Sequence, residues 1–203
     1  NNSNENVLSI SSAFASSNNP DCLWIEENDS SKGSRVICEE IMDYIEARGF
    51  SPKEDVQVLS PMHKGNVGTI KLNSVLRSRL NPSAKSNVGY PTELAVGDRC
   101  MQETNDYDLN VWNGECGTVV DVRKGLVTVE FNDGDDLNDK RRHVQFNNKQ
   151  SRSLTLSYAC TIHKSQGQEF PVVVVPTYME HFHMLSRELV YTALTRASKL
   201  AIF

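Results

Sequence analysis

Hydrophobic residues in the first 82 positions alternate between two spacings. Residues 21–28 and 55–61 are short apolar runs typical of strands, whereas residues 30–50 and 69–82 repeat apolar side chains at helical spacing. Gly49 and Pro82 follow the last apolar position of each helical pattern, where such residues commonly end a helix. The order strand, helix, strand, helix predicts an α/β layer with a parallel sheet.

The pattern changes after Pro82 to short stretches in which apolar and polar residues alternate. Asn-Gly, Lys-Gly and Asp-Gly pairs separate these stretches, as expected at the reversals between antiparallel strands. The segment therefore predicts a small antiparallel barrel. Tyr107 and Trp112 are expected in its core, although aromatic rings can also stack on nucleic-acid bases.

From Leu154 onward, apolar strand-like runs and helical spacing alternate again, as in the first 82 residues. The sequence predicts a strand in 154–160, a turn, a fully apolar strand around 172–175, a helix in 184–198 and a final strand. The expected architecture is one α/β domain made of residues 1–92 and 151–203, interrupted by an inserted β-barrel at 93–150.

Composition excludes several classes of protein. No apolar run reaches the roughly 18 residues of a membrane helix, and the Asn/Ser-rich start lacks the features of a signal peptide, so we expect an intracellular protein without a membrane partner. The five cysteines are dispersed and indicate neither a disulfide framework nor a zinc ribbon. Cys160 with His163, and His181 with His183, fix no complete ligand set, so no metal is predicted.

The formal charge of −5 argues against a protein that coats nucleic acid by charge alone. Residues 93–150 hold twelve acidic and seven basic side chains, while the rest of the chain holds fourteen of each. The acidity therefore belongs to the expected barrel.

The segment 157–170, SYACTIHKSQGQEF, carries the densest candidate chemistry. It follows an apolar strand, and ligands in open α/β sheets bind beyond the carboxyl ends of strands. Hydroxyls, amides and a cation at this position could bind phosphate, sugar or nucleotide. The alternative interpretation is a solvent-exposed loop that binds no ligand. The residues concerned are Thr161, His163, Lys164, Ser165, Gln166 and Glu169.

Two further segments hold candidate cations. Arg196 lies near the end of the predicted helix 184–198, where it could either favour the helix terminus or act as an arginine finger toward a phosphoryl group. Lys64 lies between a strand and Gly65 and Gly68, among amides that could hold an anion. The sequence contains no phosphate loop of the form G-x-x-x-x-G-K-[ST].

These segments resemble motifs of the RecD/TraA group of 5′ to 3′ superfamily 1B helicases, which includes the α subunit of exodeoxyribonuclease V. SYACTIHKSQGQEF is similar to motif V, ELVYTALTRA to motif VI and VLSPMHKGNVG to motif IV, while residues 93–122 are similar to the inserted SH3-like barrel. The four blocks lie in the family's order and cover most of the chain after Val56. Lys64 stands where the family often has arginine, so it keeps the charge without the bidentate fork.

The resemblance implies a RecA-like second motor domain and a role for each matching residue. Arg196 would be the catalytic arginine finger, and the ATP-binding set would add Lys64, Gln166, Gly167 and Glu169. The DNA-binding set would comprise Pro61, Met62, Thr161, His163, Lys164 and Ser165.

The resemblance also implies cofactors and partners. ATP and Mg²⁺ would act in the full-length enzyme, with neither held by this fragment alone. The partners would be single-stranded DNA, the preceding motor domain of the same chain and RecB/RecC-like subunits, in the cytoplasm. The alternatives are a stand-alone nucleic-acid-binding module, which predicts salt-sensitive strand affinity, and a protein-interaction adaptor built on the barrel, which predicts indifference to DNA.

Overall fold

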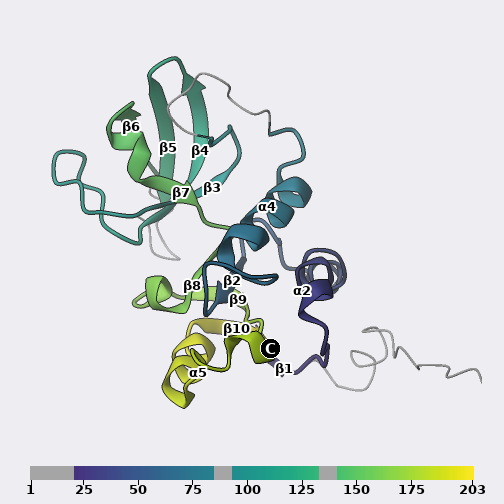
Figure 1. The fold of residues 1–203 in the computed structure, drawn as a ribbon. Coiled ribbons are helices and arrows are strands. Elements are labelled where there is room, and N and C mark those ends of the chain that lie inside the picture. Colours follow the sequence, from purple (N-terminus) through teal and green to yellow (C-terminus); the bar gives the residue numbers. More distant parts are fainter. Residues whose placement is uncertain (1–20, 85–92, 133–140) are drawn as a thin grey trace, which may run out of the picture.

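A computed structural model describes residues 21–84, 93–132 and 141–203, which form two five-stranded sheets (Figure 1). Every pairing in the first sheet is parallel, and its order is β1-β10-β9-β2-β8. Its strands are β1 (Cys22–Leu23), β2 (Val56–Ser60), β8 (Ala159–Thr161), β9 (Phe170–Val174) and β10 (Ala197–Ile202). The predicted parallel α/β sheet is confirmed. The strand expected at 21–28 is shorter, because only Cys22 and Leu23 pair with β10 at the sheet edge.

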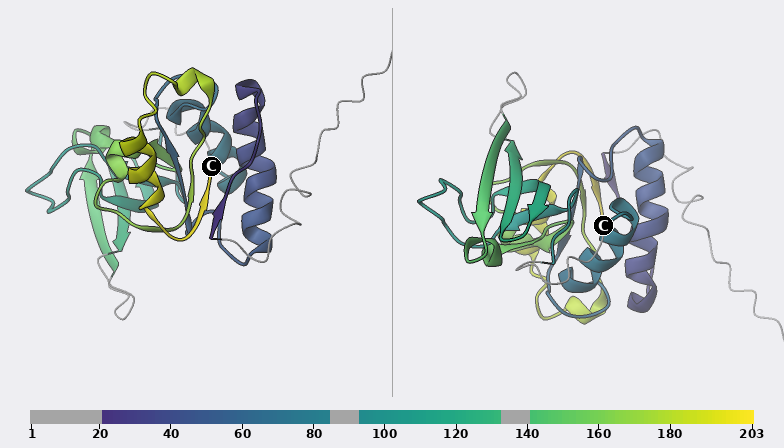
Figure 2. Two further views of the ribbon diagram at one scale, coloured as in Figure 1. Left: turned by 90° about the horizontal axis from the view of Figure 1, so that it is seen from below. Right: turned by 90° about the horizontal axis from the view of Figure 1, so that it is seen from above.

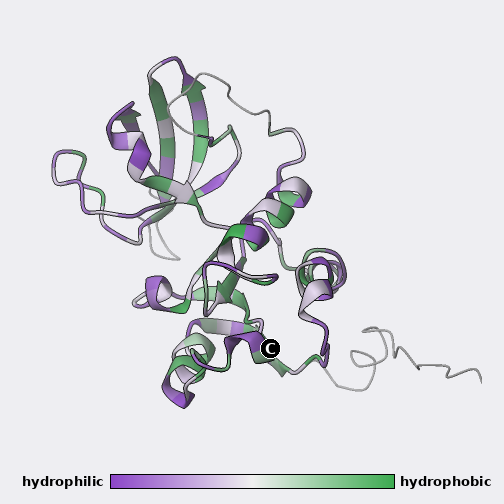
Figure 3. Ribbon diagram, viewed as in Figure 1, coloured by the Kyte–Doolittle hydropathy of each residue, from purple (hydrophilic) through white to green (hydrophobic). Residues whose placement is uncertain are grey.

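Alternate residues of β9 pack against opposite layers, which explains its continuous valine run. Val172 and Val174 contact the core beneath the N-terminal helices, whereas Val173 packs in the core that contains Leu189 and Ala193. Both faces of the sheet are therefore covered, as parallel sheets require. Figure 2 shows the N-terminal helices and the C-terminal helix on different sides of these strands, and Figure 3 shows the hydrophobic strands between them.

The N-terminal helical stretch is continuous and consists of α2 (Ser30–Val36), a π-helical turn η1 (Ile37–Ile41) and α3 (Met42–Ala47). Asp29 caps its start by accepting a hydrogen bond from the Ser31 amide (3.0 Å). Gly49 follows its end with φ of +83°, the left-handed conformation expected of a terminating glycine. The prediction for 30–50 is confirmed apart from the π-helical turn.

Two further helices flank the sheet. α4 (Thr69–Leu80) buries Leu72 and Leu76, as its spacing predicts. α5 (Arg187–Leu194) begins at Ser186, whose hydroxyl accepts a hydrogen bond from the Leu189 amide (3.2 Å). The helix expected at 184–198 is shorter at both ends, because the cap lies at Ser186 and β10 begins at Ala197.

The second sheet is antiparallel, with the order β6-β5-β4-β3-β7. Its strands are β3 (Arg99–Gln102), β4 (Cys116–Arg123), β5 (Leu126–Asn132), β6 (Arg141–Asn147) and β7 (Leu154–Leu156). Gly114 and Gly125 have φ of +89° and +88°, as the Asn-Gly and Lys-Gly reversals predict. The Asp-Gly pair at 133–134 lies outside the described residues.

Two details of the expected barrel are corrected. The strand predicted at 154–160 is divided, because Leu154–Leu156 pairs with β3 while Ala159–Thr161 joins the parallel sheet. The antiparallel sheet therefore extends beyond residue 150. Tyr107 and Trp112 are not core residues, since 76% and 46% of their surfaces are exposed on the loop between β3 and β4.

Candidate nucleotide and DNA site

Motif IV and motif V residues meet at the carboxyl edge of the parallel sheet. Ser60 at the end of β2 pairs in register with Thr161 at the end of β8, so Pro61 and Met62 begin beside the polar turn that follows β8. The buried Ser60 hydroxyl donates to the Val67 carbonyl (2.8 Å) and thereby closes the loop between β2 and α4. The fold brings these two segments together from positions about 100 residues apart.

The turn after β8 is the short helix η3 (Ile162–Ser165), and it uses two of the predicted hydroxyls internally. Thr161 accepts a hydrogen bond from the Lys164 amide (3.4 Å), and Ser165 donates to the Ile162 carbonyl (2.8 Å). Both side chains are buried, whereas His163 is exposed. The half-buried Lys164 ammonium forms an ion pair with Glu103 of the antiparallel side.

A groove of about 930 Å³ runs between α4, the β8 turn and the antiparallel sheet. Thr161 and Lys164 lie on its wall together with groups that the sequence patterns did not identify. These groups are His63, Asn73, Arg77, Arg152 and Thr155. Glu93 and Glu103 also line it, so the groove carries mixed charge with several cations and amides.

Asn73 of α4 protects the outer edge of β8. Its side-chain amide donates to the Ala159 carbonyl (2.8 Å) and its carbonyl accepts from the Ala159 amide (2.9 Å). These bonds replace those of a neighbouring strand, so the edge is paired. They also hold α4 against the strand that leads into η3.

Arg196 lies between α5 and β10, at the amino edge of the parallel sheet. Its Nη1 donates to the Gln168 carbonyl (3.0 Å), and its Nε donates to the Thr192 carbonyl (3.3 Å). The Phe170 amide in turn donates to the Arg196 carbonyl (2.8 Å), which joins the arginine to the start of β9. The guanidinium is half-buried and held from two sides.

Gln166, Gly167 and Glu169 are exposed on the segment that connects η3 to β9. Gly167 has φ of +83°, and a Cβ there would meet nothing within 4 Å, so open space surrounds the chain. Because β8 and β9 run in the same direction, this segment crosses from the carboxyl edge to the amino edge of the sheet. It therefore brings Gln168 and Glu169 toward Arg196, whereas Gln166 directly follows η3. The DNA-binding candidates stay at the other edge.

Lys64 is not brought together with Arg196. It is exposed in the loop after the carboxyl end of β2, while Arg196 precedes the amino end of β10. The five residues of β9 lie between these edges, a span of about 16 Å at roughly 3.3 Å per residue. Among the described residues, the Lys64 ammonium forms no ion pair or hydrogen bond.

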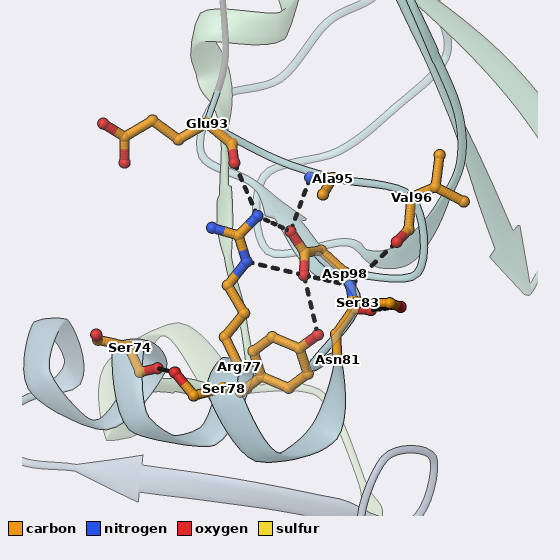
Figure 4. Close-up of polar contacts among 10 residues, drawn as sticks. Ser74, Arg77, Ser78, Asn81, Ser83, Glu93, Ala95, Val96 and Asp98 are labelled. Carbon is orange, nitrogen blue, oxygen red and sulfur yellow. Dashed lines mark hydrogen bonds and ion pairs between the residues drawn. The ribbon is translucent and has the colours of Figure 1, made fainter. Parts of the chain in front are cut away.

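The two sheets are joined by a buried polar network around Asp98 (Figure 4). Arg77 of α4 reaches the carboxylate through Nη2 (2.6 Å) and Nε (3.1 Å). Asn81 and the Ala95 amide each donate at 2.8 Å. Tyr158 donates at 3.2 Å, and burial raises the pKa of its hydroxyl so that it stays protonated. Asp98 thus fixes the start of the antiparallel sheet to α4 and to the approach to β8.

The structure bears on the metal and membrane expectations only over the residues that it describes. Within residues 21–84, 93–132 and 141–203, no three His, Cys, Asp or Glu side chains cluster as a metal site. Burial raises the pKa of the Cys160 thiol to about 12, so this thiol is protonated at neutral pH. Over the same ranges, none of the helices combines the length and the apolar character needed to cross a membrane.

The structure combines a helix-flanked parallel sheet with an antiparallel sheet inserted between α4 and β8, and each part overlaps a match to a helicase domain. Residues 156–203 match the UvrD-like helicase C-terminal domain, and residues 72–131 match the ATP-dependent RecD-like DNA helicase SH3 domain. The chain belongs to the RecD-type superfamily 1 helicases and corresponds to their C-terminal region.

Individual relatives agree with this assignment. The ATP-dependent RecD2 DNA helicase of Deinococcus radiodurans is 39% identical over 142 residues, which cover 70% of this chain and 19% of that protein. The RecBCD enzyme subunit RecD of Buchnera aphidicola is 30% identical over 157 residues, covering 74% of this chain and 25% of that protein. The chain thus spans about a fifth to a quarter of these relatives.

Solved helicase structures are also similar. The Pif1 helicase from Bacteroides, in complex with ADP-AlF3 and ssDNA, is 21% identical with a TM-score of 0.49. The match covers 76% of this chain and 41% of that one.

Proposed function

We propose that this chain is the C-terminal half of an ATP-dependent 5′ to 3′ DNA helicase motor that acts in recombination and repair. Residues 1–92 and 151–203 form the second motor domain, apart from β7, which pairs with the inserted barrel of residues 93–150. The chain contributes an arginine finger and part of a single-strand track in the cytoplasm. It does not hydrolyse ATP alone, and it works with the preceding motor domain and with RecB/RecC-like subunits.

One observation carries this proposal. The segment 162–169 begins beside the groove and ends where Gln168 holds Arg196, so a single stretch of chain links two candidate sites at opposite sheet edges. A motor must relate its grip on a strand to its nucleotide state, because translocation comes from alternating grip. A stand-alone binding module requires no such link.

The groups at the amino edge fit one side of a nucleotide site. Arg196 supplies a cation, Glu169 supplies a carboxylate beside the residue that holds this cation, and Gln166 supplies an amide at the start of the same segment. ATP bound by the preceding domain with Mg²⁺ supplies phosphoryl transfer to water. Arg196 places a fixed positive charge against that phosphate, and the Gln168 and Thr192 carbonyls orient its guanidinium before contact.

The groove fits a strand held by its backbone. His63, Lys164 and Arg152 offer cations or hydrogen-bond donors, while Asn73 and Thr155 offer neutral polar groups. Such contacts to phosphate and sugar position a strand without reading its sequence, as a translocating motor requires. The nearby Glu93 and Glu103 limit the affinity and so favour release as well as grip.

Arg152→Ala is expected to weaken single-strand binding by the complete protein about tenfold, and to reduce the salt slope by about 0.7, the value for one lost phosphate contact. Fluorescence anisotropy with a labelled oligonucleotide at several salt concentrations measures both quantities. Arg123→Ala is the matched control, because Arg123 is exposed on β4 and paired with Asp121 outside the groove. Equal affinities for the two variants would remove Arg152 from the track.

A further inference from the structure

The side chain of Gln168 bridges the two parts of the molecule. Its Nε2 donates to the Gly114 carbonyl (2.5 Å), and its Oε1 accepts from the Cys116 thiol (3.6 Å). The main-chain carbonyl of the same residue accepts from Arg196 Nη1 (3.0 Å). One residue therefore contacts the antiparallel sheet with its side chain and the candidate arginine finger with its backbone.

The acceptor on the antiparallel side is firmly placed. Gly114 is buried in the turn before β4, and its amide donates to the Gln102 carbonyl (2.8 Å) of β3. Its φ of +89° suits glycine and directs the turn toward the Gln168 side chain, which would lie 3.4 Å from a Cβ at Gly114. The hydrogen bond thus ends on a buried turn that is itself bonded to β3.

A second bond holds the same segment four residues earlier. Lys164 forms an ion pair with Glu103, which follows β3 directly and lines the groove. The segment 164–168 is therefore tied to the antiparallel sheet at both of its ends. The ion pair between Lys164 and Glu103 lies in the groove. The bond to Gly114 is made by Gln168, whose main-chain carbonyl also holds Arg196.

We propose that Gln168 is a positioning residue that fixes the Arg196 guanidinium to the antiparallel sheet, so that strand binding in the groove sets how Arg196 is presented to phosphate. This inference rests on the proposed function and adds the route between its two sites. Replacing the side chain removes the bond to Gly114 and leaves the carbonyl acceptor of Arg196 in the chain. The arginine keeps its partner but loses its fixed aim, and small misplacements of a catalytic group cost large factors in rate.

Gln168→Met tests this in the complete protein, because methionine keeps the length of the side chain and removes its amide. We expect the strand-stimulated kcat for ATP hydrolysis to fall about tenfold. The KM for ATP and the Kd for single-stranded DNA should stay within about twofold of their normal values. A purely structural role would instead lower the melting temperature and move all of these quantities together.

Two controls keep the test decisive. Gln145→Met makes the same exchange at an exposed position of β6 and should leave the stimulated rate unchanged. Gln168→Glu keeps the size and polarity but presents a carboxylate to the Gly114 carbonyl, so it should lose stimulation even if the methionine variant is poorly folded.

The outcomes separate this inference from the proposed function. Full stimulation in both Gln168 variants, together with loss of hydrolysis in Arg196→Ala, overturns the positioning role and leaves the motor intact. Full hydrolysis in Arg196→Ala overturns the proposed function itself. Loss of stimulated kcat alone in the Gln168 variants establishes the route.

Discussion

Arg196→Ala is expected to lower single-strand-stimulated ATP hydrolysis by the complete protein about a thousandfold, the lower end of the effect of an arginine finger. The guanidinium lies at the amino edge of the parallel sheet, where the Gln168 and Thr192 carbonyls hold it in a fixed direction. Removing it leaves charge on a transferred phosphoryl group without its cation. A steady-state assay of phosphate release with saturating single strand measures the loss.

Variants at related positions define what this loss means. Arg187→Ala removes an exposed arginine from the first turn of α5 and should leave hydrolysis unchanged. Arg196→Lys should recover only part of the rate, because an ammonium keeps the charge but lacks the planar fork. A rate for Arg196→Ala within threefold of normal would make Arg196 a structural residue that closes α5 onto β9.

Asp98→Ala is expected to lower the free energy of unfolding by about 3–5 kcal/mol, the usual cost of removing one partner from a buried ion pair. The Asp98 side chain is fully buried, and that of Arg77 is 20% exposed. The change leaves the Arg77 guanidinium and the Asn81 amide without their shared acceptor. Urea unfolding of this chain, followed by circular dichroism, gives the difference directly.

The control for Asp98 is another aspartate of the antiparallel sheet. Asp121 is 41% exposed and paired with the exposed Arg123, so Asp121→Ala should change stability by less than about 0.5 kcal/mol. Combining Asp98→Leu with Arg77→Leu should recover part of the loss, since neither partner is then left buried alone. A loss below about 1 kcal/mol for Asp98→Ala would mean that the network does not hold the sheets together.

Local patterns in the sequence predict most of the fold. The helical spacing of 30–50, the valine run of β9 and the glycine reversals at Gly114 and Gly125 each report a local preference that the structure keeps. The pairing of Leu154–Leu156 with the antiparallel sheet could not be predicted in this way, because its partner strand is β3, some 50 residues earlier. Strand partners depend on tertiary packing, which periodicity does not encode.

The residues of the candidate site also fall into those that local motifs reveal and those that only tertiary packing brings together. The sequence singles out Arg196 and Lys164 because each lies in its own recognisable motif, Lys164 within a run of polar residues. Arg152 carries no such signal, since it reaches the groove only through the packing of the two sheets. The bond from Gln168 to Gly114 spans 54 positions and ends on a backbone carbonyl, so side-chain identity could not reveal it.

Lys64 shows how a motif can suggest a role that the fold does not support by proximity. The loop that carries it belongs to the same edge as the strand-binding candidates, away from Arg196. We therefore regard contact with a phosphate of the DNA strand as the more suitable role for its charge. The ATP-binding role remains a prediction from resemblance.

Nucleotide affinities of the complete protein and of its Arg196→Ala variant, measured with single-stranded DNA bound, give the sharpest test of Arg196 as the arginine finger. The ligands are ADP and ADP with aluminium fluoride, which imitates the phosphoryl group in transfer. We expect equal affinity for ADP and a loss of about a hundredfold or more for the analogue, because the guanidinium acts only on the transferring group. Equal affinity of both proteins for the analogue would contradict the assignment of Arg196 as the arginine finger of this motor.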